Sequence, residues 1–328
     1  MTKKDVLLSI VVLLLSYGQI QLSMAQSAPS RGSVRSLEAL TIRHAAHSDV
    51  GFPAAEMRNA GDQADAVALG LAKTKVYKFR SIDYPGAIES FVYDYDDRSA
   101  VGWAAYPGDD VIAFYFHANT YRFLDALPAA SFIHGINASG QMVGTYYDSA
   151  DIGHGFLYSG STLTTIDPPG STSTSAWGIS DTGSIVGFYS DASGGHNSFL
   201  YKKGTFTTIE YPHAAQTIAN GINSAGDIVG YYDDPAHGFL LKGGTYSSFD
   251  FPMAESTEAY AINDAGEIAG TYIDARDVEH GFTYSGGMFT QVDVPGAADT
   301  ELYRIKNNKN VVGSVKDSLG EVHGFIGK

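Results

Sequence analysis

NGINSAGDIVGYYDDPAHGFLLKGGTYSSFDFP, residues 220–252, is the clearest copy of a unit that occurs six times in this chain of 328 residues. A Val-Gly or Ala-Gly pair marks each copy, and successive marker glycines are 42, 43, 43, 40 and 43 residues apart. A period of this length with several short strand-like runs per unit is typical of a β-propeller. The marker glycines are Gly102, Gly144, Gly187, Gly230, Gly270 and Gly313.

Each unit divides into four expected strands that are rich in β-branched and aromatic residues. The first strand is short, as at residues 134–137, and a tight turn such as residues 223–226 follows it. Asn and Gly favour that turn, because Asn hydrogen-bonds nearby backbone and Gly adopts a positive φ. The second strand resembles residues 228–232, the third residues 155–158, and the fourth the Thr-rich residues 205–212.

The two ends of the repeat region indicate how the units are arranged. The last unit ends at residues 323–328 without a fourth strand, whereas residues 77–86 are an isolated fourth strand at the start. We therefore expect an all-β fold, a six-bladed β-propeller of four-stranded blades, in which the amino-terminal strand completes the last blade. Closure removes exposed sheet edges. An open solenoid is the alternative, but it usually needs capping units.

The units resemble the HAF-type extracellular repeat of bacterial proteins, which is named for a His-Ala-Phe-like core. The resemblance covers residues 77–328 and departs at residues 112–114, which lack the histidine, and at His196, which is displaced by one position. It implies an exported repeat protein and brings no reaction or catalytic residue. The matching cores are His154-Gly155-Phe156, His237-Gly238-Phe239, His280-Gly281-Phe282 and His323-Gly324-Phe325, each behind an apolar segment that ends in the marker glycine.

The segment before the repeats predicts export. Lys3 and Lys4 precede ten mostly apolar residues at 6–15, and residues 23–25 offer a small-x-small cleavage site. We expect a signal peptide at residues 1–25, a partly disordered tether at 26–75 and the propeller at 76–328. An uncleaved anchor is the alternative; after cleavage no membrane span is expected. With no cysteine in the chain, we expect a secreted or periplasmic protein without disulfide bonds.

The formal net charge of −15 bears on which partners the chain accepts. Nucleic acids and anionic lipids need basic patches for attraction, so we expect neither as a partner. The charge suits cations or neutral ligands such as glycans. Catalytic motifs with a nucleophilic Ser or Cys, and phosphate-binding loops, do not occur, and no cofactor is expected.

Repeated histidines and acids are expected to be structural. Copies in different blades lie too far apart to share one metal ion, so we expect each histidine ring to bond nearby backbone and each loop acid to cap its own turn. No metal site is assigned. Calcium binding by loop acids is the alternative, with Asp94, Asp96 and Asp97 as the densest cluster, and His44 with His47 is a weaker metal candidate.

Function is expected where the repeat stops repeating. One position, two residues before the Ile of each first strand, varies between units, with Val92 at the matching place in the first unit. Because first strands are innermost in a propeller, this position should ring one mouth of the central channel. Aromatic faces stack on sugars and polar side chains give directional hydrogen bonds. The expected ligand-binding residues are His134, Trp177, Asn220, Tyr260, Tyr303 and Arg304.

We therefore expect a binding or interaction module for a carbohydrate or cell-surface polymer, or for a protein partner, at the channel mouth. The alternative is a hydrolase or lyase that acts on a polysaccharide with His134 and loop acids, so the question of enzyme activity stays open. A third interpretation is a purely structural protein. Binding predicts an exposed aromatic shelf, catalysis predicts a loop acid within hydrogen-bond range of His134 or across the channel from it, and a structural role predicts that the ring is buried or plugged.

Overall fold

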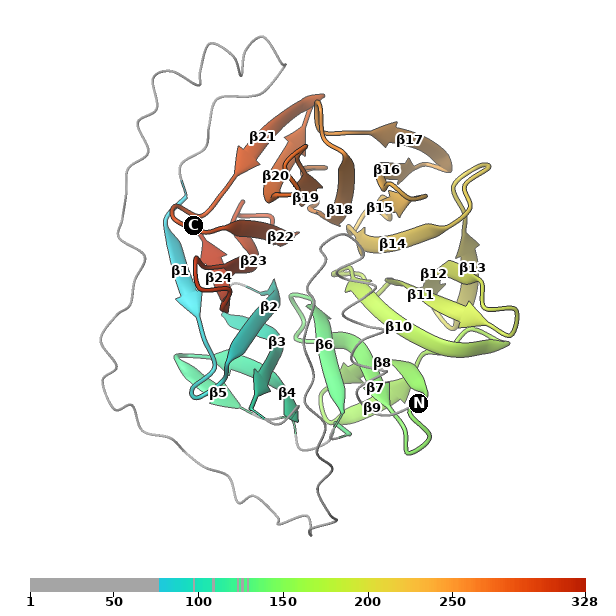
Figure 1. Ribbon diagram of the computed structural model, residues 1–328. Helices are drawn as coiled ribbons and strands as arrows, with labels where there is room; N and C mark the ends of the chain where they lie inside the picture. Colours follow the sequence, from blue (N-terminus) through green and yellow to red (C-terminus); the bar gives the residue numbers. More distant parts are fainter. Residues whose placement is uncertain (1–76, 97, 108–109, 123, 125–126, 129) are drawn as a thin grey trace, which may run out of the picture. The chain divides into compact units, whose positions relative to one another are not determined.

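The computed structural model describes residues 77–328 except 97, 108–109, 123, 125–126 and 129 (Figure 1). The expected signal peptide, the tether and its two histidines lie outside the described residues, as does Asp97. The described part belongs to one compact unit, Phe52–Lys328. Its elements are 24 β-strands, β1 to β24. In this part of the chain no helix has the length and apolar character needed to cross a membrane.

The unit around residues 220–252 forms the four strands that its sequence predicts. They are β14 (Thr217–Ile222), β15 (Ile228–Tyr232), β16 (His237–Lys242) and β17 (Thr245–Phe249), which pair antiparallel in chain order. Gly226 ends the β14–β15 turn with φ +87°, and Asn223 accepts the Asp227 amide in that turn. The Asn-x-x-Gly signal therefore marks a true strand reversal.

Three further units each form a four-stranded sheet of the same kind. We number the units one to six by their marker glycines. Unit two contains β6 (Ser131–Ile136), β7 (Met142–Tyr147), β8 (Gly153–Ser159) and β9 (Thr162–Thr165); unit three contains β10 (Ser171–Ile179), β11 (Ile185–Asp191), β12 (His196–Lys202) and β13 (Thr205–Ile209); unit five contains β18 (Ser256–Ile262), β19 (Ile268–Ile273), β20 (Glu279–Ser285) and β21 (Met288–Val292).

Units one and six share an eight-stranded sheet. Unit one contributes β2 (Glu89–Tyr95), β3 (Ser99–Tyr106), β4 (Asp110–His117) and β5 (Thr120–Arg122), and unit six contributes β22 (Asp299–Ile305), β23 (Val311–Lys316) and β24 (Val322–Gly327). A single parallel pair, Glu89 with Val322, joins the two halves.

The amino-terminal strand β1 (Phe79–Ile82) completes the set of strands in unit six. It pairs antiparallel with β24 over four residue pairs, as the sequence predicts. Beyond the strand, the backbones of Lys78 and Lys328 exchange two hydrogen bonds of 2.9 and 3.0 Å. The two ends of the described chain are therefore fastened together.

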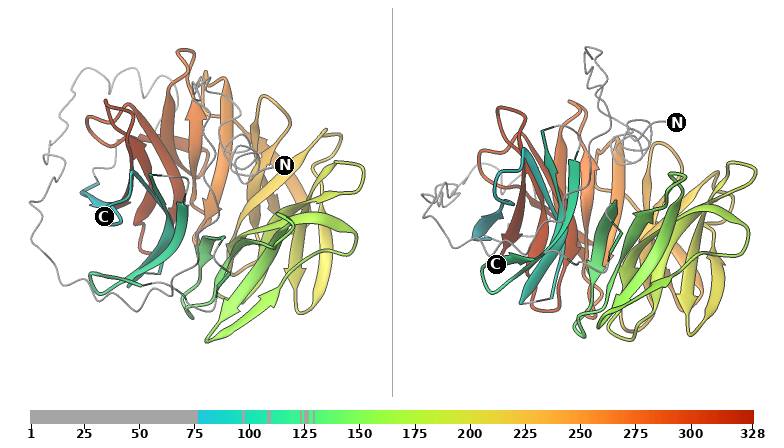
Figure 2. Two further views of the ribbon diagram at one scale, coloured as in Figure 1. Left: turned by 60° about the horizontal axis from the view of Figure 1, so that its bottom comes forward. Right: turned by 90° about the horizontal axis from the view of Figure 1, so that it is seen from below.

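The sheets stand around a common axis, with the first strands β2, β6, β10, β14, β18 and β22 nearest to it (Figure 1). First strands of successive units contact one another, and β2 contacts β22. In the turned views the sheets stand side by side around the axis, not stacked in two layers (Figure 2). The fold is an all-β propeller.

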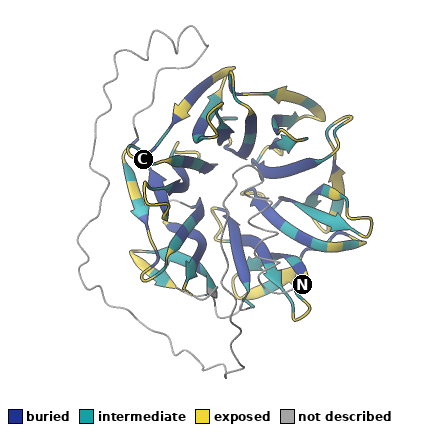
Figure 3. Ribbon diagram, in the orientation of Figure 1, coloured by how far each residue is buried: buried dark blue, intermediate teal, exposed yellow. Residues whose placement is uncertain are grey.

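The marker glycine is needed because of a bulge in each first strand. In unit four Ala219 pairs with Gly230 and Gly221 with Val229, which leaves Asn220 between them without a partner on β15. A Cβ atom on Gly230 would lie 1.8 Å from the Ile218 carbonyl oxygen, so no other residue fits. The third-strand phenylalanines, such as Phe239, are at most 1% exposed and belong to the hydrophobic core. Figure 3 shows in dark blue the buried parts of the strands.

Candidate functional site

The register shift occurs at the same place in all six first strands and defines a ring of six bulge residues. The register places Tyr93, not Val92, in this ring, because Val92 pairs with the marker glycine Gly102 and the shift follows it. The sequence register for unit one was therefore wrong by one residue. We call the set the bulge ring: Tyr93, His134, Trp177, Asn220, Tyr260 and Tyr303.

The bulge ring is brought together but is buried, with at most 8% of any residue exposed. The rings pack on one another: Tyr93 stacks on Tyr303 at 4.6 Å between centroids, and His134 stacks on Trp177 at 4.4 Å. These side chains therefore do not form the expected exposed aromatic shelf, because their apolar surfaces pack against neighbouring residues. Ligand binding by these residues stays a prediction.

Arg304 occupies the axis of the ring. Its Nη1 donates to the carbonyls of Tyr260 and Tyr303 at 3.2 and 2.8 Å. Its Nη2 donates to the carbonyls of His134 and Trp177 at 3.0 and 2.6 Å. The bulges turn these carbonyls inward, and one guanidinium with five N–H donors satisfies four of them. Arg304 therefore ties units two, three, five and six together.

Asp94 completes this tie from unit one. Its Oδ2 accepts the Arg304 Nε at 3.3 Å and the Ile136 amide at 2.9 Å, and its Oδ1 pairs with Lys306 at 2.9 Å. Both Asp94 and Arg304 directly follow the bulge. At this position the other units have only small residues, Gly135, Gly178, Gly221 and Ala261.

His134 lacks the surroundings of a catalytic base. Its Nδ1 donates to the Ala176 carbonyl at 3.1 Å. Burial lowers the pKa of His134 to about 4; the hydrogen bond to Ala176 opposes this shift, and the Arg304 charge adds to it. In the described residues no carboxylate is hydrogen-bonded to the ring. Of the two arrangements that the enzyme alternative expects, the acid within hydrogen-bond range of His134 is thus not seen among the described residues.

Two carboxyl groups lie two residues before the bulge residue in units five and six. The hydroxyl of Tyr260 donates to Glu258 at 2.5 Å, and that of Tyr303 donates to Glu301. Both glutamates are only partly buried. The Glu301 charge acts on Glu258 and the Glu258 charge acts on Tyr231, so groups from units four, five and six lie near one another here. Other units have Phe91, Phe132, Ser175 and Ile218 at this position.

Glu279, at the start of β20, adds a third carboxyl group, and we call Glu258, Glu279 and Glu301 the carboxyl cluster. Burial raises the pKa of Glu258 to about 7, with the Tyr260 hydrogen bond opposing and Glu301 adding to the rise. Burial and then the Glu301 carboxylate raise the pKa of Glu279 well above its usual range. The raised pKa values favour the protonated form of Glu258 and Glu279, and a protonated carboxyl group both donates and accepts hydrogen bonds.

Two buried polar atoms in this region have no hydrogen-bond partner among the described residues: Thr271 Oγ1 and Trp177 Nε1. Thr271 is the cross-strand partner of Glu258, so both side chains lie on one face of the sheet. Trp177 belongs to the bulge ring. An unpaired buried polar group costs free energy, and such groups in a native fold call for an explanation.

The repeated histidines bond carboxylates instead of the backbone groups that the sequence analysis expects. His154 Nδ1 lies 2.6 Å from Asp167 and its Nε2 3.5 Å from Asp148, and His280 bridges its two acids in the same way. The loop acids also cap their own turns as expected; Asp148, for example, accepts two amides. His154 and His280 thereby join the loop after the second strand to the end of the fourth, and His237 bonds Asp250 at the end of the fourth strand.

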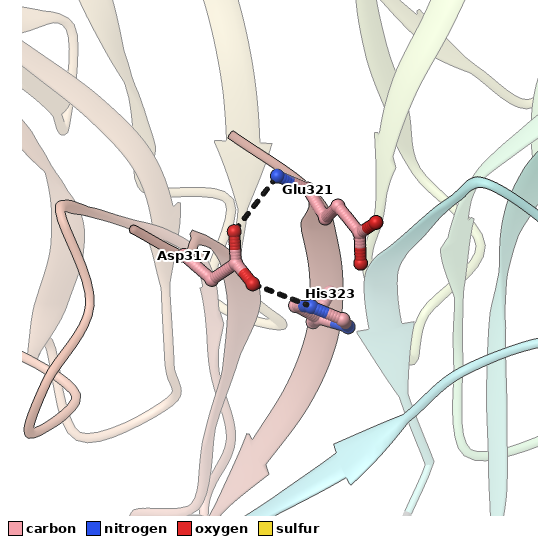
Figure 4. Close-up of side chains that lie close together, drawn as sticks. All are labelled: Asp317, Glu321 and His323. Carbon is pink, nitrogen blue, oxygen red and sulfur yellow. Dashed lines mark hydrogen bonds and ion pairs between the residues drawn. The ribbon is translucent and has the colours of Figure 1, made fainter. Parts of the chain in front are cut away.

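In unit six this motif gains a third acid. Asp317 and His323 occupy the usual places, and Asp83 from the amino-terminal strand supplies the fourth-strand acid, 3.2 Å from His323 Nδ1. Glu321 lies beside them (Figure 4), and ligand atoms of Asp317, Glu321 and His323 all lie within 4.8 Å of one another. The sequence analysis assigned no role to Glu321.

The carboxyl cluster was also missed, although a signal was present. Glu258 and Glu301 are charged at a strand position where the other units have Phe, Ser or Ile, which is a departure from the repeat like the one that selected the bulge ring. Their proximity to Glu279 depends on how neighbouring sheets pack, which the sequence does not reveal.

No protein-family model matches the chain, and no curated protein matches it, so the HAF-type resemblance stays a prediction. Among solved structures, TolB from Acinetobacter baumannii matches with TM-score 0.51 and 9% identity over 70% of this chain and 64% of TolB, less than two thirds of its length. A mutant Aleuria aurantia lectin in complex with α-methyl-L-fucoside matches with TM-score 0.47 and 13% identity over 76% of this chain and 96% of the lectin.

The propeller domain of the Trilobed protease from Pyrococcus furiosus matches at the same level, with TM-score 0.47 and 8% identity over 74% of this chain and 94% of that one. Another structure of the Aleuria lectin, described as a six-bladed β-propeller, matches with 13% identity over 79% of this chain and 93% of that one, also at TM-score 0.47. At such identities the likeness concerns the fold alone, an all-β propeller.

Proposed function

We propose that this protein is a six-bladed propeller that binds one neutral, polyhydroxylated ligand, a carbohydrate or cell-surface polymer, at the axial end lined by the carboxyl cluster. The observation that carries the proposal is the Tyr260–Glu258 pair, in which a tyrosine hydroxyl hydrogen-bonds a partly exposed carboxyl group whose pKa burial raises to about 7. Such groups donate and accept hydrogen bonds without a full charge, which suits sugar hydroxyls.

Three further observations support this location. Tyr260 and Tyr303 of the bulge ring hold two of the carboxyl groups in place by hydrogen bonds. Thr271 Oγ1 and Trp177 Nε1 are buried without partners in the described residues. Finally, the acids are confined to units five and six, so the end of the axis is asymmetric although the fold repeats.

The test is a melting-temperature screen of the full chain against neutral glycans, including the α-methyl-L-fucoside that the Aleuria lectin binds. Glu258→Gln and Tyr260→Phe keep the packing and change only the polar groups, whereas Trp177→Ala would leave a cavity. Glu255→Gln, an exposed change three residues away, is the matched control. A ligand present at a hundredfold excess over its Kd stabilises the fold by about 2.7 kcal/mol.

A glycan that raises the melting temperature of wild type and of Glu255→Gln, with the shift reduced in both cluster variants, supports the proposal. No shift with any glycan, or equal shifts in all variants, would move the function to a protein partner or a structural role.

A second candidate function is hydrolysis of a polysaccharide by the carboxyl cluster. Glycoside cleavage needs one protonated and one ionised carboxyl group on either side of the scissile bond. The raised pKa values of Glu258 and Glu279 favour the protonated partner. Release of reducing ends from any glycan that binds, with the release lost in Glu258→Gln, would identify the protein as an enzyme.

We further propose that the protein is exported, on the strength of the leader-like residues 1–25, and that it is an HAF-type repeat protein. Sequencing the amino terminus of the protein recovered from outside the producing cell tests this. A start at residue 26 supports export with cleavage, and an intact residue 1 in the cytoplasm contradicts it.

A further inference from the structure

Unit six differs from the other units in one loop. The loop between β23 and β24 contains Asp317 and Glu321, four residues apart. In the units with a loop of equal length, the position of Glu321 is occupied by Ile152, Gly195 and Val278. Since units two and five join a histidine to two acids without a third, Glu321 is not needed for that tie.

The geometry of the loop directs three ligand groups to one place. Asp317 Oδ1 accepts the amides of Leu319 and Glu321 at 2.8 and 2.9 Å, which fixes the loop. The second oxygen, Oδ2, lies 3.8 Å from His323 Nε2. Figure 4 shows the Asp317 carboxylate between the Glu321 backbone and the His323 ring, and one ligand atom from each of the three residues lies within 4.8 Å of the others.

Asp83 sets the orientation of the imidazole. Its Oδ1 lies 3.2 Å from His323 Nδ1, on the side of the ring away from Asp317. A carboxylate that holds one ring nitrogen while the other nitrogen faces the acids is the arrangement that metal-binding histidines usually have. Because Asp83 directly follows β1, which pairs with β24, the arrangement exists only when the two ends of the described chain are paired.

We propose that Asp317, Glu321 and His323 bind one divalent transition-metal ion, for which Zn²⁺ is the best match. Zn²⁺ binds imidazole nitrogen and carboxylate oxygen at about 2.0–2.2 Å, and three protein ligands leave a position for water or another molecule. Ca²⁺ prefers six to eight oxygens, so a site with imidazole suits it less well. Glu321 is exposed, and rotation of its side chain closes the remaining distance. This site is independent of the proposed glycan site.

The test is calorimetric titration of the full chain with ZnCl₂. Glu321→Ile introduces the residue that unit two has and is expected to abolish one equivalent of binding, and Glu321→Gln is a second variant that keeps the shape. Asp83→Asn should weaken the same equivalent about 10–100-fold. Zn²⁺ bound elsewhere, for example at His44 and His47, persists in all three variants.

Unit two provides both matched controls. His154→Gln removes the corresponding histidine from a site without the third acid and should leave zinc binding unchanged. Ile152→Glu supplies the missing acid beside Asp148 and His154 and should add one equivalent. Loss of one equivalent in both Glu321 variants supports the site; equal binding by wild type and these variants, or no binding by wild type, would overturn it.

Discussion

Met253 and His213 are single residues in which the backbone conformation conflicts with the side chain. Both lie at the tip of the turn that leads into a first strand, with φ +63° and +67°. At the same tip the other units have Gly86, Gly170 and Gly296, with φ from +79° to +86°. Only glycine adopts this region without steric cost, so these two tips carry strain that their sibling turns do not.

Met253→Gly should therefore stabilise the protein. Relief of the left-handed strain outweighs the greater freedom of glycine in the unfolded chain, for a net gain of about 0.5–1 kcal/mol. Urea unfolding measures the change. The control is Ala254→Gly in the same turn, which lacks positive φ and should destabilise. If Met253→Gly destabilises as much as Ala254→Gly, the turn is not strained.

Arg304 and Asp94 permit a second prediction at this scale. Both side chains are at least 93% buried, and removing Arg304 leaves four backbone carbonyls without its donors, while Asp94 keeps its pair with Lys306. Arg304→Ala should cost about 3–5 kcal/mol in urea unfolding. The double variant Asp94→Gly/Arg304→Ala, which introduces the small residues of the other units, should cost less than the sum of its single changes. Strict additivity would contradict the coupling.

At the scale of elements, units two, four, five and six each have a third-strand histidine that fastens the sheet to a carboxylate. The third-strand His280 receives its strongest interaction from Asp293 at the end of the fourth strand, and Asp274 in the preceding loop adds to it. These contacts raise the pKa of His280 in spite of burial. All three residues recur at a constant spacing in the sequence, but the contact between them depends on strand pairing. For this reason the sequence analysis expected a backbone group, not a carboxylate, as the partner of the histidine ring.

The raised pKa makes this tie dependent on pH. A histidine whose pKa is higher in the folded state contributes stability that is complete below its unfolded pKa of about 6.5 and disappears as pH rises through the folded value. His280→Gln should therefore cost up to about 1 kcal/mol at pH 5.5 and much less at pH 9. Urea midpoints of both proteins at the two pH values check this. An equal cost at both would contradict the charged pair.

Sequence reasoning succeeded best for elements whose signal is local. The Asn-x-x-Gly turns, the four strands per unit and the pairing of β1 with β24 all follow from residues that recur in register. It failed by one residue at Val92, because a bulge adds a residue that spacing alone does not reveal. Sequence reasoning also placed the bulge ring at an open channel mouth. In the structure Arg304 fills the centre of the ring, where it donates to carbonyls from four units, and this convergence of carbonyls is not visible in the sequence.

At the scale of the whole molecule, the propeller is held where its ends meet. β1 pairs with β24, Asp83 reaches His323, and Arg304 reaches Asp94, so three separate contacts join the first and last units. The sequence predicted the first of these from the missing fourth strand. The other two depend on single residues that replace the repeat's usual choice or lie outside it.

Joining the ends should consequently be tolerated. A circular permutant that links Lys328 to Tyr77 and opens the exposed turn between Gly243 and Gly244 is expected to fold and to unfold in one cooperative transition. Opening within β7 between Val143 and Gly144, which are buried, is the control and should not fold. Circular dichroism during urea unfolding distinguishes them. Failure of the first permutant would contradict the closed arrangement.

The proposed ligand site at the carboxyl cluster occurs once in a fold whose units repeat six times. The number of ligands bound per chain is therefore its most direct test. Native mass spectrometry of the full chain with soluble neutral oligosaccharides gives the number bound per chain at saturation. We predict one oligosaccharide per chain, with binding weakened in Glu258→Gln and unchanged in Glu255→Gln. Several equivalents per chain, or one that Glu258→Gln leaves unaffected, would contradict a site at the axial carboxyl cluster.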